Sequence, residues 1–261
     1  MKVCYITTIN SLKEISGKSD YLFCLAPFVE KENTYAEFFR NESRKGKFII
    51  VDDSIAENGG VLSSWELIQK AIEVKASEIV IPDVLGDYRK TRIKRNDFLK
   101  ENYQDLKYRK IRTMSVIQGS NLKEYEKCLQ EIEDDDRIDT IGIPFRIEFH
   151  KFNEISKEES CMLNRVLFVK GHKFKKPIHL LGNNLPVEIF LLNECKSIRS
   201  LDSKLMARYG LNEMVFDIND KIKPKRKLYI ENNLTKKQIE FAIKNINKLE
   251  KEVLKYGQKK S

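Results

Sequence analysis

Residues 48–53 read FIIVDD, and residues 63–83 read SSWELIQKAIEVKASEIVIPD. The first stretch is an apolar run typical of a buried strand, and the second contains a helical pattern followed by another strand. Ser63 and Glu66 have the spacing of a capping box, in which each side chain accepts a hydrogen bond from the other residue's backbone, so we expect a helix to begin there. A strand, a helix and a second strand in this order favour parallel strands joined by a crossover helix.

The same alternation continues along the chain and predicts eight strands. They cover residues 2–7, 21–26, 48–52, 78–81, 113–117, 140–143, 178–181 and 197–201. The predicted fold class is α/β, a (β/α)8 barrel of the TIM type, and an open doubly wound sheet is the alternative. No G-x-G-x-x-G follows the first strand, so a dinucleotide-binding sheet lacks its main support.

The chain is predicted to divide near residue 220. We expect residues 1–220 to form the barrel catalytic domain, and residues 221–261 to form a basic linker and a C-terminal helix packed on the barrel. Thr235 and Gln238 have the spacing of a second capping box. The helix after them carries one apolar stripe, formed by Ile239, Ala242, Ile243, Ile246, Leu249 and Val253.

Composition describes a globular protein. With 41% hydrophobic and 33% charged residues, the 261-residue chain can bury one sizeable core. No apolar run is long enough for a membrane span and no signal-peptide pattern opens the chain, so we expect a cytoplasmic protein of a bacterium or a phage-infected cell. The five cysteines and three histidines lack metal-ligand spacing, so we expect no metal site and no cofactor.

Carboxylates recur where predicted strands end. Asp52 and Asp53 follow the third strand, Asp83 the fourth and Asp202 the eighth, while Gln118, Gly142 and Gly182 mark other strand ends. An aspartate before a helix is often only its N-cap. In a parallel barrel, however, the carboxyl ends of the strands form the rim on which active sites are built. The sequence therefore predicts a polar site at this rim.

Such a rim suits chemistry at a nucleoside. One carboxylate can attack the anomeric carbon while a second moves the proton. A third carboxylate beside a glutamine can read a guanine edge, because guanine presents two adjacent N–H donors and one carbonyl acceptor.

The motifs resemble those of the tRNA-guanine (queuine) transglycosylase superfamily, and they are most similar to its shorter 7-deazaguanine DNA transglycosylases of phages and bacterial DNA-modification clusters. The similarity covers about residues 48 to 210. Residues 50–57 (IVDDSIAE) resemble the family's D-S-G-G-F-Q or D-N-G-A-F-E segment, with Ser54 and Ile55 in the glycine positions. The other motifs are residues 81–87 (IPDVLGD), 116–119 (VIQG), 140–144 (TIGIP), 179–182 (HLLG) and 197–203 (SIRSLDS).

The resemblance implies a role for each matched residue. Asp202 would be the nucleophile and Asp52 the acid/base, with Asp53 as the other candidate for the acid/base role. Asp83 would hold the guanine edge, and Gln118 with the N–H of Gly119 would contact the base carbonyl. The remaining substrate-binding positions are Asp53, Gly142, Gly182 and Glu57.

The resemblance also bears on the polymer. The tRNA enzymes carry a C-x-C-x-x-C zinc module beyond the nucleophile, whereas no cysteine follows Cys195 here, so DNA is favoured over tRNA. The net charge of +9 suits a phosphate backbone, although a solvated basic surface is the plainer reading. The residues expected to contact nucleic acid are Arg89, Arg92, Lys94, Arg95, Arg199, Lys225 and Arg226.

The expected activity is therefore replacement of guanine in nucleic acid by a 7-deazaguanine such as preQ0, through a covalent aspartyl–sugar intermediate. The alternatives are the same reaction on tRNA, a glycosidase that uses water in place of the incoming base, and a catalytically silent nucleic-acid or nucleotide-binding barrel. A metal-dependent barrel nuclease is a further alternative without visible metal-ligand spacing. Whether the protein acts as a monomer or a homodimer stays open.

Overall fold

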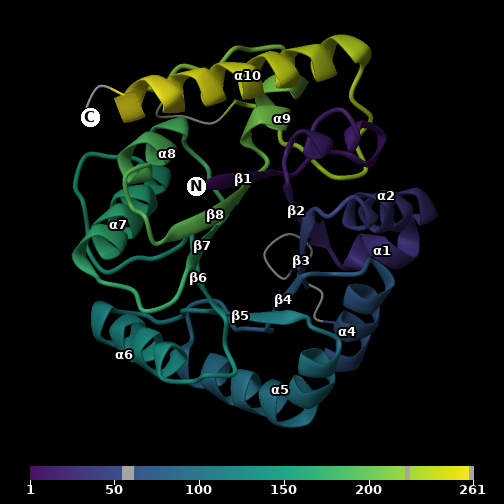
Figure 1. Cartoon of the computed structure of the whole chain (residues 1–261). Coiled ribbons are helices and arrows are strands. Elements are labelled where there is room, and N and C mark those ends of the chain that lie inside the picture. Colours follow the sequence, from purple (N-terminus) through teal and green to yellow (C-terminus); the bar gives the residue numbers. More distant parts are fainter. Residues whose placement is uncertain (55–61, 221–223, 259–261) are drawn as a thin grey trace. The chain divides into compact units, whose positions relative to one another are not determined.

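The computed structural model describes residues 1–54, 62–220 and 224–258. Its fold class is the one predicted from the sequence, a (β/α)8 barrel of the TIM type (Figure 1). All eight strands belong to one sheet, in the order β1-β8-β7-β6-β5-β4-β3-β2. In this order each strand from β2 to β7 lies beside the next strand along the chain, as is usual for strands joined by crossover connections.

The strands lie where the apolar runs predicted them, with ends that differ by at most two residues. They are β1 (Lys2–Tyr5), β2 (Tyr21–Leu25), β3 (Phe48–Asp52), β4 (Glu78–Val80), β5 (Arg112–Val116), β6 (Thr140–Pro144), β7 (Ile178–Leu181) and β8 (Ile198–Ser203). The largest difference that concerns the site is at β8, which continues through Asp202 to Ser203. Asp202 is therefore inside its strand and does not follow it.

Helices occupy most of the connections between strands. They are α1 (Pro27–Lys31), α2 (Asn33–Arg44), α4 (Ser64–Glu73), α5 (Tyr88–Tyr108), α6 (Leu122–Glu133), α7 (Lys157–Gly171), α8 (Pro186–Leu192), α9 (Leu205–Leu211) and α10 (Lys236–Gln258). The β1–β2 connection, which is fully described, contains only two 3-10 turns, η1 (Ile9–Ser11) and η2 (Ser16–Lys18).

The chain forms two compact units. Unit 1 comprises Met1–Ser19, Phe145–Lys173 and Leu180–Ser261, and unit 2 comprises Asp20–Pro144 and Phe174–His179. The border between them passes within β7. The α10 helix belongs to the same unit as β1 and β8, so these units do not follow the division that we expected at residue 220. That division stays a prediction.

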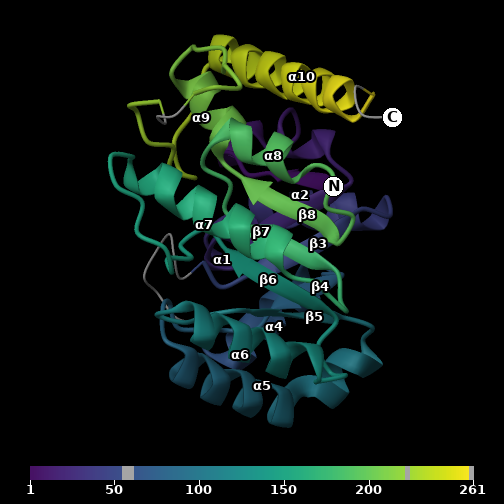
Figure 2. The ribbon, with the colours of Figure 1, turned by 90° about the vertical axis from the view of Figure 1, so that its left-hand side faces the viewer.

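In unit 2, parallel pairing brings several strand ends to one edge of the sheet. Leu25 of β2 pairs with Asp52 of β3, and Val80 of β4 pairs with Met114 of β5. Consecutive residues of β3 are fully buried, as is typical of parallel strands covered on both faces. Figures 1 and 2 show α4, α5 and α6 on the outer side of these strands.

Both predicted capping boxes are present. Ser63 accepts from the backbone N–H of Glu66 while the Glu66 carboxylate accepts from Ser63. Thr235 and Gln238 make the equivalent pair of bonds at the start of α10. In unit 1 the α10 helix lies beside α9 (Figures 1 and 2). Its buried face includes Ala242, Ile246 and Leu249 of the predicted stripe.

Candidate active site

A buried acid–amide pair lies in unit 2, in the loops after β4 and β5. Asp83 and Gln118 are 7% and 1% exposed. The Gln118 Nε2 group donates to Asp83 Oδ2 at 2.5 Å, and Gln118 Oε1 accepts from the Gly86 backbone N–H at 2.9 Å. The Gly86 bond fixes which end of the amide is the oxygen, so the Gln118 NH2 group faces the carboxylate. The two residues predicted to read a base are therefore neighbours.

The environment of Asp83 changes its acidity. Burial raises the pKa of Asp83 to about 6, the hydrogen bond from Gln118 opposes this rise, and the charge of Asp53 adds to it. The charge of Lys94 also lowers the pKa of Asp83. At neutral pH the group is therefore mainly a carboxylate, and its protonation responds to small changes in pH.

The third strand ends as the sequence predicted. Asp52 is the last residue of β3 and is half-buried, and its Oδ2 accepts from the Ser54 N–H at 2.9 Å. Asp53 is buried, and its charge acts on Asp83. Ser54 has a φ of 60°, the left-handed conformation that glycine adopts easily and serine rarely. Ser54, which stands at a glycine position of the matched segment, therefore has a backbone conformation that is open to glycine. Glu57 lies outside the described residues.

Gly119 has a structural reason to be glycine, and the backbone of Gly142 takes part in the sheet. A Cβ on Gly119 would lie 2.8 Å from Cβ of Glu124 and 3.0 Å from the backbone N of Tyr125, so the start of α6 requires glycine at this position. The carbonyl of Gly142, in β6, accepts from the Ile117 N–H at 2.9 Å. The base-binding roles of Gly119 and Gly142 stay predictions.

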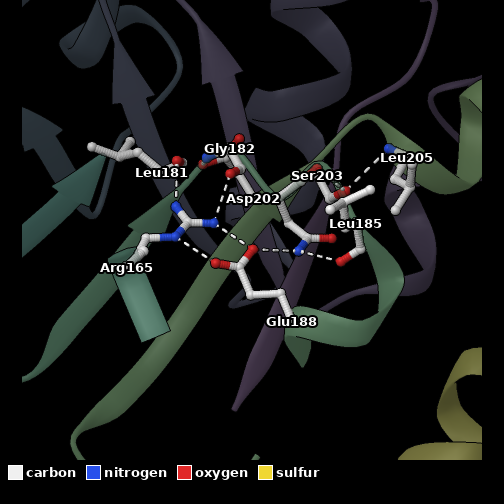
Figure 3. Close-up of polar contacts among 9 residues, drawn as sticks. Arg165, Leu181, Gly182, Leu185, Glu188, Asp202, Ser203 and Leu205 are labelled. Atoms are coloured by element: carbon white, nitrogen blue, oxygen red, sulfur yellow. Dashed lines mark hydrogen bonds and ion pairs between the residues drawn. The ribbon is translucent and has the colours of Figure 1, made fainter. Parts of the chain in front are cut away.

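In unit 1, Asp202 is 6% exposed within β8. Its Oδ1 accepts from the Gly182 backbone N–H at 2.8 Å (Figure 3). Its carbonyl accepts from the Asn183 N–H at 2.8 Å. Gly182 has a φ of 70°. The loop after β7 therefore holds the side chain and the backbone of Asp202 together, and the two predicted residues Gly182 and Asp202 are in direct contact.

The N-cap interpretation fails for two of the aspartates. The helix after Asp83 is α5, and its N-cap is Asp87, which accepts from the Lys90 N–H. The helix after Asp202 is α9, whose N-cap is Lys204. Neither Asp83 nor Asp202 is therefore explained by capping the helix that follows it.

The sequence analysis did not predict a buried ion pair next to the Gly182 backbone. Arg165 of α7 is fully buried, and its guanidinium makes two bonds with the carboxylate of Glu188 in α8, from Nε at 2.7 Å and from Nη2 at 2.6 Å. The available signal was periodicity, because Arg165 lies on the face of α7 that also buries Cys161 and Phe168.

The residues expected to contact nucleic acid differ in exposure. Arg89, Arg92, Lys225 and Arg226 are exposed, and Lys94 and Arg199 are half-buried. Arg95 is 3% exposed and its guanidinium donates to Glu131 at 2.6 Å. The assignment of Arg95 to a nucleic-acid surface is therefore wrong, because its charge is used inside the fold between α5 and α6.

Metal clusters and membrane spans are both absent from the described residues. Among them, no group of three or more His, Cys, Asp or Glu side chains could hold a metal ion. No helix in this part of the chain is both long and apolar enough to cross a membrane.

The fold and the site define the class of protein, a (β/α)8 barrel with buried carboxylates in and after its strands. No protein-family model matches the chain, and no curated protein matches it. The transglycosylase resemblance therefore stays a prediction.

Proposed function

We propose that the protein exchanges guanine in nucleic acid, with DNA favoured over tRNA, for a 7-deazaguanine such as preQ0. The Asp83–Gln118 pair carries this proposal. The Gln118 NH2 group is a donor, and beside it the Asp83 carboxylate offers acceptors. A donor next to acceptors complements the guanine edge, where the O6 acceptor adjoins the N1–H and N2–H donors. A 7-deazaguanine has the same edge, so one pair can bind both the leaving and the entering base.

The proposed reaction proceeds in two steps. The Asp202 carboxylate attacks C1′ of the nucleotide, the C1′–N9 bond breaks, and Asp52 supplies a proton to the departing guanine, directly or through water. The sugar is then held as an ester of Asp202. In the second step Asp52 takes the N9 proton of the 7-deazaguanine, N9 attacks C1′, and the Asp202 carboxylate is released.

Base flipping is part of the proposal. The reacting nucleotide must leave the stack before a buried carboxylate can reach C1′. The positive charge of the chain, with exposed Arg89 and Arg92 on α5, suits attraction to the phosphates on either side of that nucleotide.

The decisive experiment is intact-mass detection of the covalent adduct. The protein is incubated with guanine-containing DNA or with tRNA, each with and without preQ0. We expect an adduct with DNA that decays when preQ0 is added, with preQ0 appearing in the polymer. Asp202→Asn, which keeps the side-chain size, abolishes the adduct, and exposed Asp136→Asn serves as the matched control.

The outcomes separate the alternatives. Full base exchange by an Asp202→Ala variant overturns the assignment of the nucleophile. Release of free guanine without incorporation of preQ0 indicates a glycosidase. An adduct with tRNA alone would identify tRNA as the substrate in place of DNA and would leave the proposed reaction mechanism unchanged. Binding to nucleic acid without any adduct indicates the silent binding barrel.

A further inference from the structure

The buried Arg165 joins α7 and α8 to the loop that follows β7. Besides its two bonds to Glu188, the guanidinium donates from Nη1 to the Leu181 carbonyl at 2.8 Å and from Nη2 to the Gly182 carbonyl at 2.9 Å. Figure 3 shows this guanidinium between the Glu188 carboxylate and the Leu181–Gly182 backbone. One planar guanidinium therefore fixes the Glu188 carboxylate of α8 and the two carbonyls of Leu181 and Gly182 at the end of β7.

One peptide group links Arg165 to Asp202. The Leu181 carbonyl, which accepts from Arg165, and the Gly182 N–H, which donates to Asp202 Oδ1, belong to the same peptide plane. Hydrogen bonds in series polarise one another, so a cation on the carbonyl strengthens the N–H as a donor. The chain of contacts runs from guanidinium to carbonyl, across the peptide, and from N–H to carboxylate.

Glu188 and the following loop complete the support. The Glu188 carboxylate also accepts from the Asn183 Nδ2 group at 2.8 Å, and the Asn183 N–H donates to the Asp202 carbonyl. The Ser203 hydroxyl donates to the Asn183 carbonyl at 3.1 Å. The ion pair thus fixes both ends of the turn that contacts Asp202.

Stability alone is a weak reason for this arrangement. Arg165 and Glu188 are 0% and 1% exposed, and removing two charges from water costs about as much as their attraction returns. Well-packed apolar residues of similar volume often replace a buried ion pair without loss of stability. What such residues cannot do is hold two backbone carbonyls in place.

We propose that Arg165, held by Glu188, is a positioning residue for Asp202. It sets the orientation of the Leu181–Gly182 peptide, whose N–H fixes the carboxylate for attack on C1′. This inference rests on the proposed function for the role of Asp202, whereas the positioning itself is a property of the protein without substrate.

The test uses the double variant Arg165→Met/Glu188→Leu, which replaces the ion pair by apolar residues, and the milder variant Arg165→Lys. The matched control is Lys47→Met/Glu42→Leu, which removes another mostly buried ion pair outside the candidate site, together with the contact between Glu42 and exposed Lys45. Thermal unfolding establishes which variants are folded. Amide hydrogen exchange at Gly182 and the rate of adduct formation at varied DNA concentration are then measured.

In the Arg165→Met/Glu188→Leu variant, we expect exchange of the Gly182 amide to accelerate about 10- to 100-fold, as loss of a supported hydrogen bond predicts. The maximal rate of adduct formation falls about 100-fold, as for a misplaced reacting group, while the half-saturating DNA concentration changes little. Arg165→Lys recovers part of both effects, because one ammonium can donate to one of the carbonyls.

Two results overturn the inference: a folded Arg165 variant with wild-type exchange at Gly182, or one with a wild-type maximal rate. If the wild-type protein forms no adduct, the proposed function fails, and the exchange at Gly182 still decides whether Arg165 orders this peptide. If the Lys47→Met/Glu42→Leu control shows the same changes as the double variant, the effect belongs to any lost ion pair, and the inference is wrong.

Discussion

At the scale of single residues, Asp83 has an environment that favours its protonated form. Its pKa of about 6 in the folded protein exceeds the ordinary value of 3.8, and burial is the main cause. Between these two values the folded protein keeps a proton that the unfolded chain has released. The free energy of unfolding therefore falls as the pH rises through this window, and the cost remains above it.

This cost predicts the effect of Asp83→Asn. Above about pH 7, the free energy of unfolding of the variant should exceed that of the wild type by up to about 3 kcal/mol. This difference should vanish below about pH 4. Urea unfolding across this pH range measures it. Exposed Asp97→Asn is the control. A difference for Asp83→Asn that is independent of pH would show that Asp83 is ionised in the folded protein as easily as in the unfolded chain.

The loss of binding should accompany the gain in stability. The side-chain amide introduced by Asp83→Asn would offer one acceptor oxygen and one NH2 group where the carboxylate offers two acceptors, so the match to the two N–H donors of guanine is lost. A stabilised variant that no longer retains guanine is the pattern expected of a site in which binding is kept at the expense of stability.

At the scale of elements, the approach of α9 to α10 depends on Gly210. A Cβ at this position would lie 2.5 Å from the Gln238 carbonyl oxygen and 2.7 Å from Cβ of Ala242. Both obstacles belong to α10 at or next to its backbone, so they cannot move without shifting the helix. Buried Asn245 of α10 also bonds the Phe216 N–H and the Met214 carbonyl, which ties the segment after α9 to α10.

Gly210→Ala should therefore destabilise the protein by about 1–3 kcal/mol, because overpacking outweighs the better helix propensity of alanine. Gly171→Ala is the matched control: it is the last residue of α7, and a Cβ there meets nothing within 4 Å. The control should change the free energy of unfolding by no more than about 1 kcal/mol, and in the stabilising direction. Equal effects of the two substitutions in thermal unfolding would contradict the close approach.

At the scale of the whole molecule, the charge of +9 predicts electrostatic attraction to nucleic acid. Its strength depends on which cations are exposed. Arg89 and Arg92 are exposed on α5, although Arg92 also lies 3.3 Å from Glu131, whereas Arg95 on the same helix is buried. Exposed cations at the protein surface can replace counterions on phosphates, and a buried one cannot.

The affinity for DNA should fall steeply between about 50 and 200 mM salt, and Arg89→Ala/Arg92→Ala should reduce the slope of log affinity against log salt by roughly 2. Fluorescence anisotropy with a labelled duplex measures both slopes. The control Lys13→Ala/Lys18→Ala removes the same charge from exposed positions in the β1–β2 connection. If both double variants lose the same amount of slope, Arg89 and Arg92 contribute only through the net charge of the protein. A flat slope for the wild-type protein would favour a free nucleotide as substrate.

Local sequence determined the elements of this protein. The runs at residues 48–52 and 178–181 coincide with β3 and β7, and both capping boxes form as their spacing predicts. These features depend on neighbours within four residues, and regular alternation of strands and helices leaves few ways to connect them. The (β/α)8 class was therefore accessible from the sequence, as was the presence of carboxylates at strand ends.

Only the tertiary structure decided how those residues are used. In the folded protein Gln118 donates a hydrogen bond to Asp83, and Ser54 has a left-handed backbone conformation. Arg165 and Arg95 are buried and pair with carboxylates from other helices. Each of these outcomes depends on a partner far away in the chain or on the local backbone shape. The identity of a charged residue does not show whether its side chain is solvated or buried. The sequence alone thus determined which strands form and which chemical groups they carry, whereas long-range packing decided which groups are paired, shielded from water and fixed in place.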